Sequence, residues 1–140
     1  MSAIRETDRV CGRVDAATRD PQYTNAKIHF RGIETCLAET LHRLQACDLL
    51  YISFDVNSID HNLVSYGTGT PIAKGFDPNE VLALMKGLIA SDKVVCMEWT
   101  EVNPLLDTKG NRMAETAFRV LREIADAVAL GTVGKGDTIF

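Results

Sequence analysis

Oxygen-bearing side chains follow an apolar run near the middle of the chain. Asp55, Asn57 and Asp60 stand at short intervals directly after the run at residues 49–54. Carboxylate and amide oxygens are ligands for hard cations such as magnesium, calcium or manganese. Two carboxylates held close together also repel each other unless a cation or a proton neutralises them. The segment is therefore a candidate cation site, although an Asp at the end of a strand is often a helix cap or a turn former.

The elements that position this segment are predicted by the alternation of hydrophobic periods along the chain. Strands are predicted near residues 27–31, 49–54 and 93–99, and helices near 33–45, 78–90 and 112–130. This order indicates an α/β fold, with a parallel sheet that carries helices on both faces in three layers (α/β/α). Ligands of such sheets bind beyond the carboxyl ends of the strands, where Asp55 and Glu101 stand.

The chain divides into three parts by composition. Residues 1–24 show no sustained period and are predicted to be irregular, residues 25–130 to form one α/β domain, and residues 131–140 to be a loose tail. The connection at residues 57–76 is rich in glycine and proline and is long for a plain link between elements. Long connections of this kind often carry function.

Composition and charge exclude several classes of protein. With 140 residues, of which 46% are hydrophobic and 24% charged, the chain has an ordinary globular composition. A net charge of −4 argues against binding to nucleic acid, which needs clustered basic residues. No apolar run approaches the roughly 20 residues that span a bilayer, so no membrane association is predicted. The absence of C-x-x-C spacing and of a signal peptide favours reduced thiols and a cytoplasmic protein.

Four segments together resemble one known family in order and spacing. They are S-F-D-V-N-S-I-D at residues 53–60, Y-G-T-G-T-P at 66–71, E-V-N-P-L-L-D at 101–107 and M-A-E-T-A at 113–117. The chain resembles the carboxy-terminal part of ureohydrolases, the arginase, agmatinase and formiminoglutamase family. The resemblance covers residues 49–124.

The resemblance implies a metal-dependent hydrolase of a guanidino or formimino compound. Members of the family bind two manganese ions (Mn²⁺) that share a hydroxide, which attacks the guanidinium or formimino carbon. By resemblance Asp55 is a metal ligand and Asn57 a weaker one, Glu101 pairs with the cationic group of the substrate, and Thr70 belongs to the loop that lines the cleft. Arginine, agmatine and formiminoglutamate remain open as substrates.

The sequence also departs from the family pattern. Asn57 replaces an Asp and supplies no negative charge, and His61 replaces a Pro, as a compensating ligand or an ordinary surface histidine. The family's G-G-D-H and D-A-H-x-D motifs are absent and are expected before Met1. We therefore expect this chain to hold at most one manganese ion, weakly.

Three interpretations of the chain follow. It is a truncated or split ureohydrolase that is inactive in isolation, a non-catalytic remnant that acts as a binding or interaction subunit, or an unrelated acidic α/β domain. The lost strands would leave a sheet edge unpaired, and unpaired edges promote association. We therefore predict a homo-oligomer or a complementing amino-terminal portion as partner.

Overall fold

The structure is a computed structural model and describes residues 25–130. Two parallel strands lie at the centre of this part of the chain. The predictions for residues 1–24 and 131–140 lie outside this range. The elements, in chain order, are α1 (Asn25–Arg31), α2 (Ile33–Arg43), β1 (Leu50–Asp55), α3 (Pro78–Ile89), β2 (Val94–Thr100) and α4 (Arg112–Ala129), with short 3₁₀ turns at Leu44–Ala46, Val56–Ser58 and Pro104–Leu106. An α/β fold with a parallel sheet was predicted and is confirmed.

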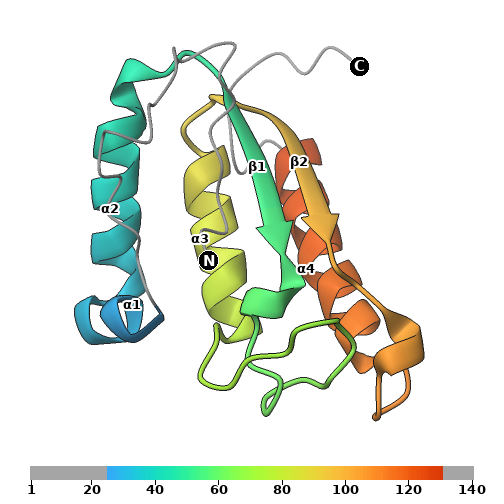
Figure 1. The fold of residues 1–140 in the computed structure, drawn as a ribbon. Helices are drawn as coiled ribbons and strands as arrows, with labels where there is room; N and C mark the ends of the chain where they lie inside the picture. The colour runs from blue at the N-terminus through green and yellow to red at the C-terminus, as the bar shows by residue number, and fades with distance from the viewer. Residues whose placement is uncertain (1–24, 131–140) are drawn as a thin grey trace.

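The core lies between one face of the sheet and the helices α3 and α4. Ile52 is opposite Met97 and Phe54 is opposite Trp99, with the two aromatic rings 4.5 Å apart. Ile52 and Phe54 are buried together with apolar residues of both helices, and α2 packs on the far side of α3 (Figure 1). Burial of this apolar surface is the main stabilising contribution to the fold.

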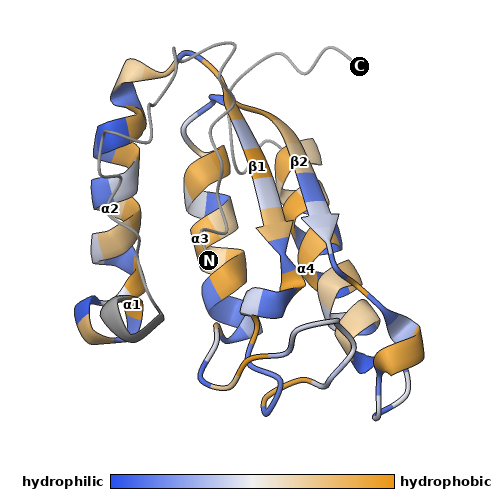
Figure 2. Cartoon of the chain, in the orientation of Figure 1, coloured by the Kyte–Doolittle hydropathy of each residue, from blue (hydrophilic) through white to orange (hydrophobic). Residues whose placement is uncertain are grey.

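Both helices behind the sheet start and pack as their sequences predict. Asp77 accepts a hydrogen bond from the Asn79 N–H (2.7 Å), and Glu80 accepts one from the Asp77 N–H (2.9 Å), which completes the capping box of α3. Buried residues recur in α4 at intervals of three or four, as expected for a helix with one apolar face. Apolar and polar residues alternate around both helices in Figure 2.

The predicted strand at residues 27–31 is wrong, because this segment is the helix α1. Ile28 is buried and Phe30 is 91% exposed, whereas a strand would place these two side chains on the same face. Gly32, with a φ of 83°, ends the helix and donates its N–H to the Ile28 carbonyl (2.8 Å). Within residues 25–130, β1 pairs with β2 and with no other strand.

The sheet face opposite the core is polar and partly open to solvent. The Ser53 hydroxyl donates to Glu98 Oε1 (2.7 Å), and Cys96 on the same face is exposed. A hydrogen bond to the Glu98 carboxylate raises the pKa of Tyr51 to about 12. Among the described residues, the helices pack on the other face of the sheet (Figure 1).

Two further expectations from the sequence concern the cysteines and membrane-spanning helices. Cys36 and Cys96 are free thiols, but Cys47 is disulfide-bonded, so the expectation of reduced cysteines is wrong for Cys47. The absence of C-x-x-C spacing does not exclude a bond between cysteines that are far apart in sequence. None of the helices described between residues 25 and 130 is long and apolar enough to cross a membrane.

Candidate functional site

The loops that follow β1 and β2 gather at one end of the sheet, because parallel strands end on the same side (Figure 1). Asp55 is the last residue of β1, and its register partner is Thr100, the last residue of β2. Glu101 therefore follows directly after the partner of Asp55. The structure brings these two predicted residues to the same end of the sheet, where ligands of parallel α/β sheets bind.

The side chain of Asp55 folds back over the turn that follows it. Its Oδ1 accepts the Asn57 backbone N–H (2.8 Å), and its Oδ2 accepts the Asn57 side-chain Nδ2 (3.2 Å). The main-chain carbonyl of Asp55 accepts the Ser58 hydroxyl (2.7 Å). Both carboxylate oxygens are thus hydrogen-bonded to the same residue, Asn57.

Asn57 connects this turn to the long loop. Its side-chain oxygen accepts hydrogen bonds from the Thr68 hydroxyl and from the Thr70 backbone N–H, the latter at 3.3 Å. Asn57 is 5% exposed and Thr68 is 2% exposed. Both ends of the carboxamide therefore make hydrogen bonds inside the protein, with the amide nitrogen on Asp55 and the oxygen on the loop.

The described residues do not fit a binuclear manganese centre. Such a centre needs several carboxylates and imidazoles that converge on two dications. No three His, Cys, Asp or Glu side chains within residues 25–130 are grouped so that they could hold a metal ion. Both carboxylate oxygens of Asp55 also accept hydrogen bonds from Asn57. The ligand roles assigned to Asp55 and Asn57 stay predictions.

Glu101 is exposed and has a strained backbone. Its φ of 68° lies in the left-handed region, which is costly for a residue with a Cβ and is often found at functional positions. Its Oε2 lies 3.6 Å from the point that a Cβ on Gly69 would occupy. Thr70, also exposed, contributes its backbone N–H to Asn57. The loop that carries Thr70 therefore lies next to Glu101, with the Thr70 side chain at the surface.

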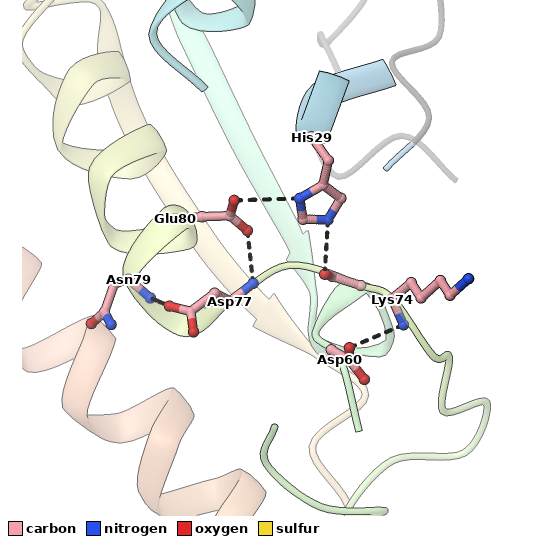
Figure 3. A network of polar contacts seen from close by, with 7 residues as sticks. His29, Asp60, Lys74, Asp77, Asn79 and Glu80 are labelled. Atoms are coloured by element: carbon pink, nitrogen blue, oxygen red, sulfur yellow. Dashed lines mark hydrogen bonds and ion pairs between the residues drawn. The ribbon is translucent and has the colours of Figure 1, made fainter. Parts of the chain in front are cut away.

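A second turn of the same local type follows at Asp60. Asp60 Oδ1 accepts the Asn62 backbone N–H (2.8 Å) and Nδ2 (3.1 Å), and Oδ2 accepts the Lys74 N–H (3.0 Å), as Figure 3 shows for Lys74. Asp60 is thus held by its own loop. The returning chain packs closely, because a Cβ on Gly75 would come within 2.4 Å of the Ser58 carbonyl oxygen.

Two histidines near these turns contact backbone carbonyls. His61 Nδ1 lies 2.6 Å from the Ile72 carbonyl oxygen, and its ring packs against Tyr66. His29 Nε2 lies 3.3 Å from the Gly75 carbonyl oxygen, and its Nδ1 lies 3.6 Å from Glu80 (Figure 3). These contacts give both rings a role in loop packing, and a metal-ligand role for His61 stays a prediction.

The sequence did not single out Asp107, which ties the loop to α4. Its Oδ2 accepts the Ser65 hydroxyl (2.8 Å) and the Met113 N–H at the start of α4 (2.9 Å), and its Oδ1 accepts the Lys109 N–H (2.8 Å). Burial raises the pKa of Asp107, but the hydrogen bonds outweigh it and leave the pKa below its usual value. An Asp just before a helix was the available signal.

The model of the family described as "Arginase family" matches residues 3–126 of the chain. Among curated proteins, the arginase of Bacillus subtilis (strain 168) is 33% identical over 102 residues, which are 73% of this chain and 34% of that protein. The formimidoylglutamase of Corynebacterium efficiens is 28% identical over 104 residues, 74% of this chain and 32% of that protein. The chain spans about a third of the length of the curated relatives it matches.

A solved structure agrees with these sequence matches. The crystal structure of arginase from Bacillus subtilis superposes with a TM-score of 0.67 at 33% identity, over 73% of this chain and 36% of that one. The two parallel strands and their helices are thus similar to part of a larger known fold.

Proposed function

This chain belongs to the arginase family, and from that premise we propose that it is the substrate-binding carboxy-terminal portion of a hydrolase. The complete assembly would cleave a carbon–nitrogen bond in a guanidino or formimino compound. The ligands of a manganese centre would come mainly from a complementing amino-terminal portion, because the described residues do not form one. The 140-residue chain by itself is inactive under this proposal.

The observation that carries the proposal is the position of Glu101. Its carboxylate is exposed at the carboxyl end of β2, next to Gly69 and one residue beyond the register partner of Asp55. A planar guanidinium or formimino cation can donate two parallel hydrogen bonds to a carboxylate, and such charge-assisted bonds are about twice as strong as neutral ones. Glu101 is therefore the group proposed to bind and orient the substrate cation.

The test is an assay with and without the missing portion. The purified chain with Mn²⁺ should release no urea from arginine or agmatine and no formamide from formiminoglutamate. Adding in trans an amino-terminal portion with the G-G-D-H and D-A-H-x-D motifs, together with Asn57→Asp, should restore turnover. Turnover by the chain without a partner would contradict the proposal.

In the restored assembly, Glu101→Ala should affect substrate more than metal. Loss of a hydrogen bond to a charged group corresponds to about 1.5–3 kcal/mol, so we expect substrate affinity to fall roughly tenfold to a hundredfold. Manganese affinity should change little. Glu34→Ala is a matched control, because Glu34 is an exposed glutamate on α2 and should leave both affinities unchanged.

The second candidate function is a non-catalytic subunit, and the contact between Asn57 and Asp55 favours it. The amide hydrogen-bonds the carboxylate that would otherwise be a metal ligand, so the chain would keep the fold and Glu101 without the chemistry. A complemented assembly that binds the substrate cation but stays inactive even with Asn57→Asp would favour this candidate.

We propose that a partner, either the complementing portion or a second copy of this chain, pairs with the open edges of the sheet. Within residues 25–130 the sheet has two strands, so one edge of each strand is unpaired. Val95 on β2 is 62% exposed. Unpaired strand edges favour association. Light scattering should find the isolated chain self-associated, and a monomer at high micromolar concentration with a cooperative melt would contradict this.

A further inference from the structure

We infer that the side-chain amide of Asn57 takes the place of a cation at the end of β1, so that Asn57 positions the loop at residues 68–70 without metal. Four hydrogen bonds carry this inference. Two run from Asn57 to the two oxygens of Asp55, and two run to the Asn57 oxygen from Thr68 and Thr70. Asp55 is the one carboxylate in this arrangement, and each of its oxygens accepts a hydrogen bond from Asn57.

The orientation of the carboxamide is fixed by its partners. The Thr70 backbone N–H is only a donor, so the atom of Asn57 that faces it has to be the oxygen. The amide nitrogen must then face Asp55, whose carboxylate is only an acceptor when ionised. The contact is therefore an attractive N–H to carboxylate hydrogen bond.

An aspartate at position 57 would reverse the sign of this contact. A second carboxylate oxygen would then stand about where Nδ2 lies, 3.2 Å from Asp55 Oδ2, with position 57 only 5% exposed to solvent. Two carboxylates this close in a site shielded from water cannot both stay ionised unless a cation binds. The Asn at position 57 removes the need for that cation.

The same carboxamide links the ends of the two strands. Asn57 holds Thr68 and Thr70, the carbonyl oxygen of Gly67 accepts the Asn103 N–H beyond β2 (2.9 Å), and Gly69 lies against Glu101. The loop is thus held between β1 and the segment that follows β2. Asn57 is a positioning residue for this loop, which lies next to Glu101, and this holds whether or not the assembly hydrolyses a substrate.

The test is the thermal melting of the 140-residue chain and its variants at neutral pH, with and without millimolar Mn²⁺. We expect Asn57→Asp to lower Tm by about 8 °C without metal, and Mn²⁺ to recover at least half of the loss. The Tm of the unsubstituted chain should not respond to Mn²⁺. Asn62→Asp is the matched control, because it makes the same change in an exposed turn, and its Tm should stay within about 2 °C.

A double variant distinguishes repulsion between two carboxylates from a general sensitivity of position 57 to substitution. In Asp55→Asn with Asn57→Asp, the amide and the carboxylate exchange places, and every hydrogen bond of the turn can form again. We expect its Tm to lie within about 3 °C of the unsubstituted chain and not to depend on Mn²⁺. If Asn57→Asp alone does not fold, the double variant still decides the matter.

Three results would overturn the inference. They are a rise of more than about 2 °C in the Tm of the unsubstituted chain with Mn²⁺, an Asn57→Asp variant as stable as the unsubstituted chain, and a double variant that is as unstable as Asn57→Asp or does not fold. None of these measurements involves substrate, so they stand apart from the outcome of the complementation assay.

Discussion

The turns at Asp55 and Asp60 have similar local hydrogen bonds but are linked to the rest of the protein by different contacts. In each, Oδ1 of the Asp accepts the backbone N–H of an Asn two residues later at 2.8 Å, and the Asn side chain returns a second bond to the carboxylate. Asn57, however, is buried and also holds the loop, whereas Asn62 is exposed. The turn at Asp60 is fastened by backbone bridges from Ile59 and Asp60 to the returning chain.

The difference shows that the D-x-N pattern sets the shape of a turn and not its role. A side chain that carries the long-range contacts, as Asn57 does, makes its turn sensitive to the chemistry of that side chain. A turn that is fastened by its backbone is sensitive to steric change and tolerant of side-chain change. The following predictions separate these two kinds of dependence, from the largest expected effect to the smallest.

The turn at Asp60 should be most sensitive to a steric clash with its backbone. Gly75→Ala would place a Cβ 2.4 Å from the Ser58 carbonyl oxygen and 2.6 Å from the Asp60 nitrogen, and backbone atoms cannot move aside cheaply. We expect the free energy of unfolding to fall by about 3 kcal/mol or more. Urea denaturation followed by circular dichroism measures it. Gly69→Ala is the control, because its Cβ would meet Glu101 Oε2 at an ordinary 3.6 Å, and an equal loss in both variants would refute the steric explanation.

The turn at Asp55 should be most sensitive to loss of the Asn57 side chain. Asn57→Ala leaves the buried Thr68 hydroxyl without its acceptor and Asp55 without the amide, and unsatisfied buried groups cost about 1–3 kcal/mol each. We expect a loss of about 2 kcal/mol by urea denaturation. Asn62→Ala removes a side-chain hydrogen bond at the surface but keeps the bond from the backbone N–H of residue 62 to Asp60. It should therefore change the free energy of unfolding by less than about 0.5 kcal/mol. Equal losses at the two positions would remove the distinction between the turns.

The loop side of the Asn57 contact should contribute less. Thr68→Val keeps the shape of the side chain but removes the hydroxyl that donates to Asn57, while the Thr70 N–H still donates to the same oxygen. We expect a loss of about 1 kcal/mol. Thr70→Val is the control, since Thr70 is exposed and uses its backbone for this contact, and it should be close to neutral. A larger loss at position 70 would show that the side chains have been assigned wrongly.

The fold could be predicted where periodic patterns are long. The helix predicted at residues 78–90 is α3 (Pro78–Ile89), and the one predicted at 112–130 is α4 (Arg112–Ala129), because each pattern runs over three turns or more. Residues 27–31 were too short to distinguish a strand from a helix, and Gly32 was the overlooked sign of a helix end.

The site could be predicted only in part. The predicted strand ends placed Asp55 and Glu101 at one end of the sheet, where the structure also has them. The sequence predicted Asn57 as a weaker metal ligand, a role that stays a prediction, and it did not show that the Asn57 amide hydrogen-bonds Asp55. That contact depends on how the loop returns to place Thr68 beside a residue eleven positions earlier, and local patterns carry no information about such a return.

Manganese binding by the purified chain tests the central claim most directly, since the claim is that Asn57 closes the turn at Asp55 without metal. Equilibrium dialysis against Mn²⁺, followed by metal analysis, gives the number of ions bound per chain. We predict no tightly bound manganese in the unsubstituted chain, and weak binding of one ion at most in Asn57→Asp. One or two tightly bound manganese ions per unsubstituted chain would contradict this explanation.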